Sequence, residues 1–550
     1  MAVRWLTAFL KAARSTEMLV VRENLELYRY EIHSLVKAFY PKENVKVIVQ
    51  GDPHAEKVLR EQPAVFMDLT FLPDAMKIVI HSKGISEEKS VAAPLQTEAG
   101  AFRAEEVNAG AGVGQMPPAE NAQTGFCTMI YSAALLSGAV KSRETRDALK
   151  TLLYGILSDF TGRELPWGDL IGIRPTKIAM TQIEEGRSDA EAAEFLMREH
   201  RVSGQKAQLA VDIANREKRI LSNIHYENGY SLYIGIPFCP TTCLYCSFPS
   251  FNIGLWRDRL DEYVDALVCE LEEAARIMEG KVLDTIYIGG GTPTALEAEH
   301  LDRICAAVES CFDLSTVQEF TVEAGRPDSI TREKLLALHG HPVTRISVNP
   351  QTMKEETLQV IGRYHTVQQV IDTFYLAREC GYDDINMDII LGLPGEGAED
   401  VRNTVARIEE LRPDSLTVHS LAVKKGSRLQ RIIDDHGYPV FLNTDETMEI
   451  AAAAAAGMGM KPYYLYRQKN MSGNFENVGY AREGAYGLYN ILIMEEKQTI
   501  MACGAGSITK RVFRQPDGSL RIERCEDAKD LKTYLGNLEE MLLRKRRLFA

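Results

Sequence analysis

The chain has 550 residues, which is enough for about three domains at roughly 100–200 residues each. Hydrophobic residues make up 45% and charged residues 25%, an ordinary composition for a globular protein that needs no disulfides to build its core. A total of 63 lysines and arginines against 77 acidic residues gives a net charge of −14. That acidity argues against nucleic acid as a partner, and no apolar run reaches the roughly 18 residues of a membrane span.

The first third of the chain changes character several times. Residues 1–17 lack an apolar core and a cleavage site, so we expect no signal peptide, and we expect this segment to be an upstream extension if translation starts at Met18. Residues 18–82 predict a small N-terminal α/β unit, because a helical run is followed by β-branched strands. Residues 83–124 are rich in Ala, Gly, Glu and Pro and predict a flexible insertion. Residues 125–228 return to helical periodicity and predict a helical N-terminal region.

Residues 229–440 carry a repeating pattern of strands and helices. Six short apolar, β-branched runs lie at 231–238, 284–291, 319–325, 345–351, 385–394 and 415–423. Amphipathic helical segments separate most of them, and this alternation predicts a parallel sheet covered by helices. Six such units in succession predict an α/β fold with a partial or full barrel, and residues 441–550 remain as a smaller C-terminal domain.

Polar, glycine and thiol residues gather where the predicted strands end. The first strand is followed by the cysteines that begin at Cys239, and the second by Gly290, Gly291 and Thr292. The third strand ends at Glu323 and the fourth at Gln351. The fifth strand contains Asp388, and the sixth continues to Ala422. Barrels place their chemistry at the carboxyl ends of their strands. The pattern therefore predicts one active site formed by all six strands.

Three cysteines stand close together in this region. Cys239, Cys243 and Cys246 have the spacing C-x3-C-x2-C, and thiolates are soft ligands suited to zinc or iron–sulfur centres. No fourth Cys or His follows, so three ligands would leave one metal position open for another molecule. The alternatives are a three-cysteine zinc site or a chance cluster. The other seven cysteines stand singly in apolar or helical contexts and predict buried small side chains in a reduced, cytoplasmic protein.

The glycine-rich turn after the second strand, Gly289–Thr294, is weaker evidence. Glycine lets a backbone approach a ligand closely, but a tight barrel turn without a ligand would have the same sequence.

Taken together, these motifs resemble a known superfamily. The cysteine spacing, with Tyr245 before the third cysteine, is similar to that of radical S-adenosylmethionine (SAM) enzymes, and the glycine turn resembles their SAM loop. The longer pattern resembles the oxygen-independent coproporphyrinogen III oxidase (HemN-like) family, most closely its HemZ branch. The resemblance implies a partial (β/α)6 TIM-like barrel, with the N-terminal α/β domain before it and a small HemN-like domain over 441–550.

The resemblance also implies roles for individual residues. Cys239, Cys243 and Cys246 would hold a [4Fe–4S] cluster whose open iron binds SAM. Tyr233, Gly290 and Glu323 would contact that SAM, and Tyr233 and Glu323 are the residues expected to act in catalysis. A second SAM would contact Tyr245, Gly291, Thr292, Gln351, Arg363, Asp388 and Ala422, with Ile508 as a further match.

The family reaction implied is oxygen-independent oxidative decarboxylation of coproporphyrinogen III to protoporphyrinogen IX in heme biosynthesis. A 5′-deoxyadenosyl radical from SAM would convert two propionates to vinyl groups, and an electron donor such as a flavodoxin or ferredoxin would be needed. Because the tetrapyrrole is a tetra-anion, the pocket needs cations. Arg174, Lys177, Arg467 and Lys469 are proposed for that role, and Tyr463, Tyr464, Tyr466 and His419 could contact the macrocycle.

Two positions depart from the oxidase pattern. Gly235 stands where the oxidase has a histidine, and Phe248 stands where it has a fourth cysteine. Both departures are shared by the heme-chaperone relatives. A heme-binding chaperone on the same barrel therefore stays open as an alternative, as does a radical SAM methyltransferase that acts on heme.

Overall fold

The computed structural model describes residues 18–41, 43–52, 55, 65–71, 75–83, 103–106, 126–134, 143–172, 174–436, 443–468 and 471–550. The predicted upstream extension and most of the predicted insertion lie outside these ranges.

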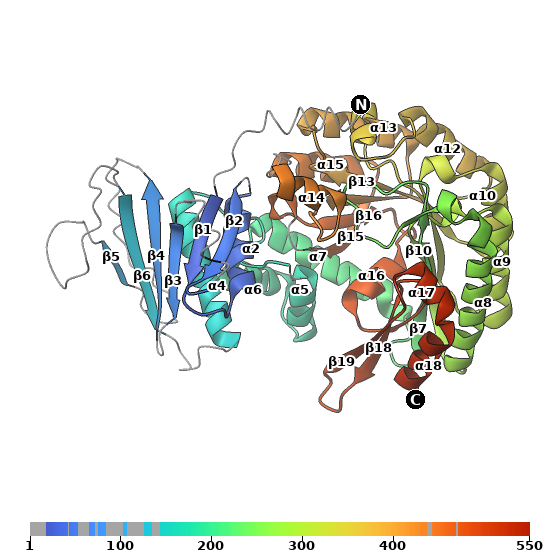
Figure 1. The fold of residues 1–550 in the computed structure, drawn as a ribbon, viewed down its shortest axis with the longest axis horizontal. Helices are drawn as coiled ribbons and strands as arrows, with labels where there is room; N and C mark the ends of the chain where they lie inside the picture. The colour runs from blue at the N-terminus through green and yellow to red at the C-terminus, as the bar shows by residue number, and fades with distance from the viewer. Residues whose placement is uncertain are drawn as a thin grey trace.

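A six-stranded sheet forms the N-terminal lobe (Figure 1). Its strands are β1 (Met18–Glu23), β2 (Asn44–Val49), β3 (Val65–Phe71), β4 (Ala75–Lys83), β5 (Arg103–Glu106) and β6 (Phe126–Ala134), in the order β2-β1-β3-β4-β6-β5. Helices α2 (Arg29–Phe39) and α4 (Arg143–Thr161) pack against it through a core that includes Phe39 and Leu153. The sequence predicts helix from residue 125, but β6 is a strand there, because it pairs along its whole length with β4.

Three helices connect this lobe to the larger one. They are α5 (Pro175–Glu184), α6 (Asp189–His200) and α7 (Gly204–Ile220). Trp167, fully buried before α5, donates its indole N–H to Glu476 in the larger lobe at 2.6 Å, and Lys206 of α7 forms an ion pair with the same carboxylate. This buried link fixes the connecting helices to the larger lobe.

The six predicted barrel strands are confirmed. They are β7 (Gly229–Ile236), β10 (Val282–Gly290), β11 (Glu319–Gly325), β12 (Arg345–Val348), β13 (Ile385–Leu391) and β14 (Ser415–Ser420). They lie consecutively in one sheet and all pair in parallel. The barrel is partial, because the sheet ends in two free edges instead of closing on itself.

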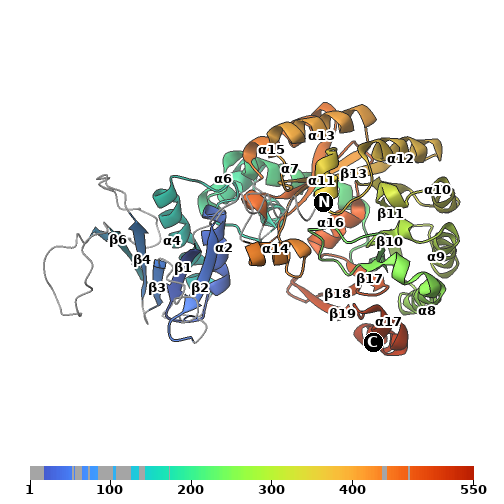
Figure 2. The same ribbon diagram turned by 45° about the horizontal axis from the view of Figure 1, so that its top comes forward.

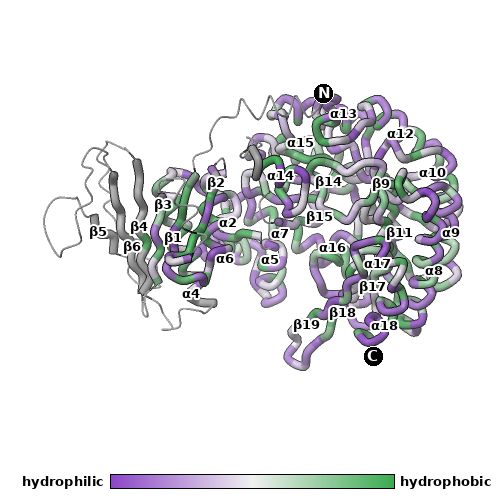
Figure 3. Tube along the Cα trace, viewed as in Figure 1, coloured by the Kyte–Doolittle hydropathy of each residue, from purple (hydrophilic) through white to green (hydrophobic). Residues whose placement is uncertain are grey.

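Helices cover the outer side of these strands (Figure 2). The main ones are α8 (Leu260–Ile277), α9 (Ala298–Cys311), α10 (Arg332–His339), α12 (Val367–Glu379) and α13 (Ala398–Leu411). Hydrophobic and hydrophilic positions are mixed along the trace of the larger lobe (Figure 3), and both faces of strands such as β12 are buried. Apolar residues alternate with polar ones along strands such as β11 and β14, and the polar positions include the cavity-lining Glu323, Thr417 and His419.

The residues predicted as a separate C-terminal domain extend both edges of the barrel sheet. After α15 (Asp445–Gly457), strands β15 (Lys461–Tyr466) and β16 (Asn477–Ala481) join antiparallel beside β14. After α16 (Leu488–Glu495), strand β17 (Thr499–Cys503) pairs in parallel with β7 and is followed by the hairpin of β18 (Ile508–Arg514) and β19 (Leu520–Glu526). Helices α17 (Leu531–Gly536) and α18 (Leu538–Phe549) end the chain.

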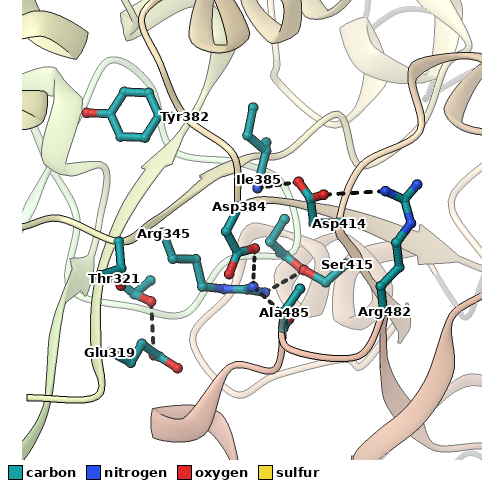
Figure 4. Close-up of polar contacts among 12 residues, drawn as sticks. Glu319, Thr321, Arg345, Tyr382, Asp384, Ile385, Asp414, Ser415, Arg482 and Ala485 are labelled. Atoms are coloured by element: carbon teal, nitrogen blue, oxygen red, sulfur yellow. Dashed lines mark hydrogen bonds and ion pairs between the residues drawn. The ribbon is translucent and has the colours of Figure 1, made fainter.

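A polar network closes the amino ends of the barrel strands (Figure 4). Arg345, at the start of β12, donates to Asp384 at 2.6 Å and to the carbonyl oxygen of Ala485 at 3.0 Å. Asp414 accepts from the backbone N–H of Ile385 at 2.9 Å and from Arg482 at 3.4 Å. These contacts stabilise the end of the barrel that lies opposite the predicted site.

In the described part of the chain, none of the helices combines the length and the hydrophobicity that crossing a bilayer requires.

Candidate functional site

A cavity of about 360 Å³ opens at the carboxyl ends of the barrel strands. The cysteine loop after β7 forms one wall, and residues that follow β10 to β14 form the others. The sequence-predicted residues that line it are Cys239, Cys243, Tyr245, Cys246, Gly290, Gly291, Thr292, Glu323, Gln351, Arg363, Asp388 and Ala422. The structure thus brings together every residue predicted to hold the cluster or SAM except Tyr233 and Ile508.

The cysteine loop is held at both ends. β8 (Phe238–Cys239) pairs with β9 (Phe251–Asn252), and the N–H of Leu244 donates to Ile361 at 2.9 Å. Burial raises the pKa of Cys239 to about 11, although the Thr292 hydroxyl donates to its sulfur at 3.4 Å. A buried thiol of this kind binds a metal as the thiolate when a cation compensates its charge.

The glycine turn after β10 lies directly against this loop. A Cβ on Gly291 would stand 2.6 Å from the carbonyl oxygen of Phe238 and 3.1 Å from the sulfur of Cys239. Gly290 has φ +108°, which disfavours any other residue. The turn therefore needs glycine in order to approach the cysteines, and this packing requirement explains part of the motif without a ligand.

Glu323 is a buried carboxyl group in the cavity wall. Burial raises its pKa to about 7, although the Tyr287 hydroxyl donates a hydrogen bond to its carboxylate. The Tyr287 ring stacks on Tyr489 at 4.5 Å between ring centroids. Glu323 can therefore accept from a cationic or N–H group of a ligand when it is ionised.

Asp388 carries the second carboxylate of the cavity. Burial alone would raise its pKa, but the neighbouring His419 and a hydrogen bond from the Asn386 amide at 2.7 Å lower it. The Nε2 atom of His419 lies 3.7 Å from the Asp388 carboxylate, and its Nδ1 lies 3.3 Å from the Tyr466 hydroxyl. His419 and Tyr466 line the cavity, so the histidine is placed beside the ligand space.

Several polar atoms of the lining have no partner among the described residues. They are Ser347 Oγ, Asn349 Oδ1, Gln351 Oε1 and Arg363 Nε, and each of these side chains is more than nine-tenths buried. Gln351 has φ +67°, an uncommon conformation for a residue other than glycine. Buried polar groups are normally hydrogen-bonded, so this set fits a polar ligand that carries both donors and acceptors.

Three cations line the cavity. Arg326 forms an ion pair with Asp328 at 2.7 Å, and Arg363 donates to the carbonyl oxygen of Asn349 at 2.6 Å. Lys424 lies 5.2 Å above the ring of Phe248 and has no carboxylate within ion-pair distance among the described residues. Lys424 is thus the cation best placed to receive a carboxylate from a ligand.

The cations proposed from the sequence lie elsewhere. Arg467 is buried beside the Trp167 ring, and its guanidinium donates to the carbonyl oxygens of Leu170 and Asn474. Its charge therefore joins the two lobes. Arg174 forms an ion pair with Glu496 at 2.6 Å, and Lys177 is exposed on α5. None of the three lines the cavity, and Lys469 lies outside the described residues.

Other predicted residues have mixed positions. Tyr233 lies behind the wall, stacked on Tyr287 at 6.3 Å and on Tyr489 at 6.0 Å. Tyr464 and Tyr466 line the cavity, whereas Tyr463 is fully buried and Ile508 begins β18 away from it.

Sequence reasoning missed Tyr287, Asn349, Arg326 and Lys424 as cavity residues. Tyr287 could have been found, since it stands on the same strand face as Gly289, two residues before the glycine turn.

Comparison with known proteins agrees with this site. Residues 233–408 match the model of the radical SAM superfamily. HemZ of Bacillus subtilis, described as an oxygen-independent coproporphyrinogen-III oxidase-like protein, is 39% identical over 398 residues, which is 71% of this chain and 78% of that protein. The chain therefore belongs to the radical SAM superfamily and, within it, to the HemZ-like proteins.

Two further relatives match over shorter stretches. The heme chaperone HemW of Lactococcus lactis is 36% identical over 39% of this chain and 51% of its own length. The oxygen-independent coproporphyrinogen III oxidase of Escherichia coli is 30% identical over 36% of this chain and 42% of its length. The solved structure of the Escherichia coli enzyme aligns with a TM-score of 0.46 at 21% identity, covering 59% of this chain and 73% of that one. These matches span about half of each relative or less in sequence.

Membership of the superfamily identifies the cofactors as a [4Fe–4S] cluster and SAM. The residues present fit both groups. The three thiols and several buried polar atoms without partners line the same cavity, although among the described residues the thiols do not lie close enough together to form a ready-made metal site.

Proposed function

We propose that the protein decarboxylates coproporphyrinogen III oxidatively, without oxygen, and so converts two propionates to vinyl groups. The product would be protoporphyrinogen IX. Its membership of the HemZ-like proteins and its similarity to a named coproporphyrinogen oxidase support this substrate class. The nine cysteines whose side chains the structure describes are free thiols, which suits the reducing cytoplasm that we propose as the protein's location.

The observation that carries the proposal is the combination, in a single cavity, of three thiols with Lys424, a cation that has no carboxylate within ion-pair distance among the described residues. When bound, the cluster and SAM supply a one-electron chemistry that can remove a hydrogen atom from an unactivated carbon. A hydrogen atom is first removed from the β-carbon of a propionate. Loss of CO2 and of one electron then leaves a vinyl group. Lys424 would hold a carboxylate of this substrate at the cavity mouth.

The chain's own residues would position the reactants. We propose that Cys239, Cys243 and Cys246 hold the cluster and that Glu323 and Gln351 orient SAM. We further propose that Asp388 and His419, which line the cavity, contact the substrate. The aromatic rings of Tyr464 and Tyr466, stacked at 6.2 Å, would pack against a flat ligand and exclude water.

A second function is favoured by one specific observation. Phe248 lines the cavity, is 59% exposed, and occupies the position where the oxidase pattern has a fourth cysteine. An exposed aromatic ring at a cavity mouth suits binding of a heme face without any reaction. A heme-delivery protein, like the relatives named heme chaperones, is therefore the alternative.

An anaerobic turnover assay separates these functions. The reconstituted, reduced protein would be mixed with SAM and coproporphyrinogen III, and the products followed by mass spectrometry. Mono-vinyl and di-vinyl products that disappear in Cys243→Ala but persist in Cys269→Ala would support the decarboxylase, because Cys269 is exposed and distant from the cavity lining. Tight heme binding without these products would support the chaperone, and a methylated linear tetrapyrrole would indicate a methyltransferase.

A further inference from the structure

Arg326 is a buried cation that reaches the cysteine loop from the end of a barrel strand. It directly follows Gly325, the last residue of β11, and is 2% exposed. Its Nη1 atom donates to the hydroxyl of Thr241 at 2.8 Å and to the carbonyl oxygen of the same residue at 3.1 Å. The same Nη1 atom lies 3.9 Å from the sulfur of Cys243. Because arginine is always protonated in proteins, a permanent positive charge is held beside the middle cysteine of the motif.

The other edge of the Arg326 guanidinium binds a carboxylate. Asp328 accepts from Nε at 2.9 Å and from Nη2 at 2.7 Å. The backbone of Arg326 is held as well, since its carbonyl oxygen accepts from the Ser329 hydroxyl at 2.8 Å. A bidentate pair of this kind fixes the plane of the guanidinium. Asp328 thus directs Nη1 toward the cysteine loop, and its own negative charge lies on the edge of the arginine that faces away from Cys243.

Holding the loop does not by itself require a charged side chain. A neutral amide could donate to the two oxygen atoms of Thr241, and it would be buried at a lower cost than a cation. Arg326 also lines the cavity in which we propose that the cluster lies. The charge of this side chain therefore calls for a role in addition to its hydrogen bonds with the loop.

A buried charge beside a cluster ligand changes how readily the cluster takes up an electron. Reduction adds one negative charge to the cluster, so a neighbouring cation stabilises the reduced form more than the oxidised form. Burial preserves this attraction, because solvent and salt screen it little. Net charge and hydrogen bonds around the cysteine sulfurs are two of the means by which proteins set the reduction potential of iron–sulfur clusters.

We propose that Arg326 raises the reduction potential of the cluster by acting through Cys243, and that Asp328 holds the guanidinium in place while it offsets part of this effect. Arg326 is thus a positioning residue, because it contacts a cluster ligand and not the reacting atoms. The proposal rests on the ligation by three cysteines proposed above, but it does not depend on the tetrapyrrole reaction. Arg363 lines the same cavity, but its expected contact with SAM would mix two effects in any variant.

The test measures the midpoint potential of the cluster in the reconstituted full chain without SAM. Dithionite supplies single electrons through redox dyes under anaerobic conditions, and electron paramagnetic resonance follows the reduced cluster. Arg326→Gln keeps a donor for Thr241 but removes the charge. We expect this change to favour the oxidised cluster by about tenfold, which lowers the potential by about 59 mV for one electron. Arg326→Lys should stay close to the wild-type potential because it keeps the charge, and Asp328→Asn should raise the potential because it removes a negative charge.

The matched control is Arg428→Gln. Arg428 donates to the carbonyl oxygen of Thr242 at 3.4 Å, so it also contacts the cysteine loop, but it is exposed and its charge is screened by solvent. Its loss should leave the potential unchanged. An unchanged potential in Arg326→Gln would overturn the proposal, and so would shifts of Arg326→Gln and Asp328→Asn in the same direction.

Iron analysis of each variant separates loss of the cluster from a change in its potential. If Arg326→Gln binds no iron, Asp328→Asn decides alone, and a potential that does not rise in that variant overturns the proposal. Cys243→Ala tests the ligation by a different readout. Undiminished iron in Cys243→Ala would overturn the proposed ligation, and the role of Arg326 with it, whatever the potentials of the arginine variants.

Discussion

The hydroxyl of Tyr287 on β10 donates a hydrogen bond to the carboxylate of Glu323 on the neighbouring strand β11. The bond favours the charged form of a carboxyl group whose pKa burial raises to about 7. The ionisation of Glu323 is thus set by the balance between burial and one phenol.

Tyr287→Phe removes this donor, so the pKa of Glu323 should rise above about 7. If the ionised carboxylate holds SAM, SAM affinity is present above the pKa and is lost as pH falls through it. We therefore expect the acid limb of the SAM-binding profile to move to higher pH in Tyr287→Phe, measured by calorimetric titration between pH 6 and 9. Tyr489→Phe keeps the hydrogen bond and should leave the limb in place. An unmoved limb in Tyr287→Phe would mean that Glu323 does not control SAM binding.

Lys424→Met should weaken the binding of a tetracarboxylate tetrapyrrole by about tenfold, because a charge-assisted contact to carboxylate is lost. SAM affinity should not change, since Lys424 is not among the residues expected to contact SAM. Lys425→Met is the matched control, because Lys425 is the adjacent lysine but does not line the cavity. Quenching of porphyrin fluorescence measures the tetrapyrrole affinity of both variants. Equal tetrapyrrole affinity in Lys424→Met and Lys425→Met would remove Lys424 from the substrate site.

Arg467→Met should lower stability and leave tetrapyrrole affinity unchanged. The guanidinium is buried between the lobes, and it donates to the backbone oxygen of Asn474 at 2.7 Å and to that of Leu170. Its loss leaves these buried carbonyl groups without a partner, at a cost of about 1–3 kcal/mol. Urea denaturation and porphyrin titration of the same variant would test the two parts. Weaker porphyrin binding at unchanged stability would restore Arg467 as a substrate ligand.

Lys545→Met should be among the most destabilising changes in the C-terminal helix. Lys545 is 1% exposed, forms an ion pair with Asp527 at 2.8 Å and another with Glu270 of α8. Removing the cation leaves two buried carboxylates uncompensated, which typically costs about 3–5 kcal/mol. Arg544→Met, an exposed neighbour on the same helix, should change the urea midpoint little. Similar midpoints in both variants would show that the buried pairs contribute no net stability.

The sequence was a good guide wherever function and burial require particular residue types. All six barrel strands were predicted, because short β-branched stretches alternate along the chain with amphipathic helices. The cavity lining was predicted through the rule that barrel chemistry lies at the carboxyl ends of strands.

The positions that sequence could not predict depend on long-range pairing. Nothing local shows that Arg467 will meet Leu170 or that Lys545 will meet Glu270, so Arg467 was assigned to the tetrapyrrole pocket and the burial of Lys545 was not predicted. The same holds for the C-terminal strands, which join two opposite edges of the barrel sheet instead of forming a sheet of their own.

The position of β17 beside β7 has a consequence for how the chain matures. The first barrel strand finds its second neighbour only in residues made close to the end of synthesis, since Tyr230 pairs with Thr499. Until those residues leave the ribosome, β7 presents an open edge beside the unfilled cysteine loop. Translation and closure of this edge are therefore coupled in time, and nascent chains that stall before β17 would be the form most exposed to aggregation.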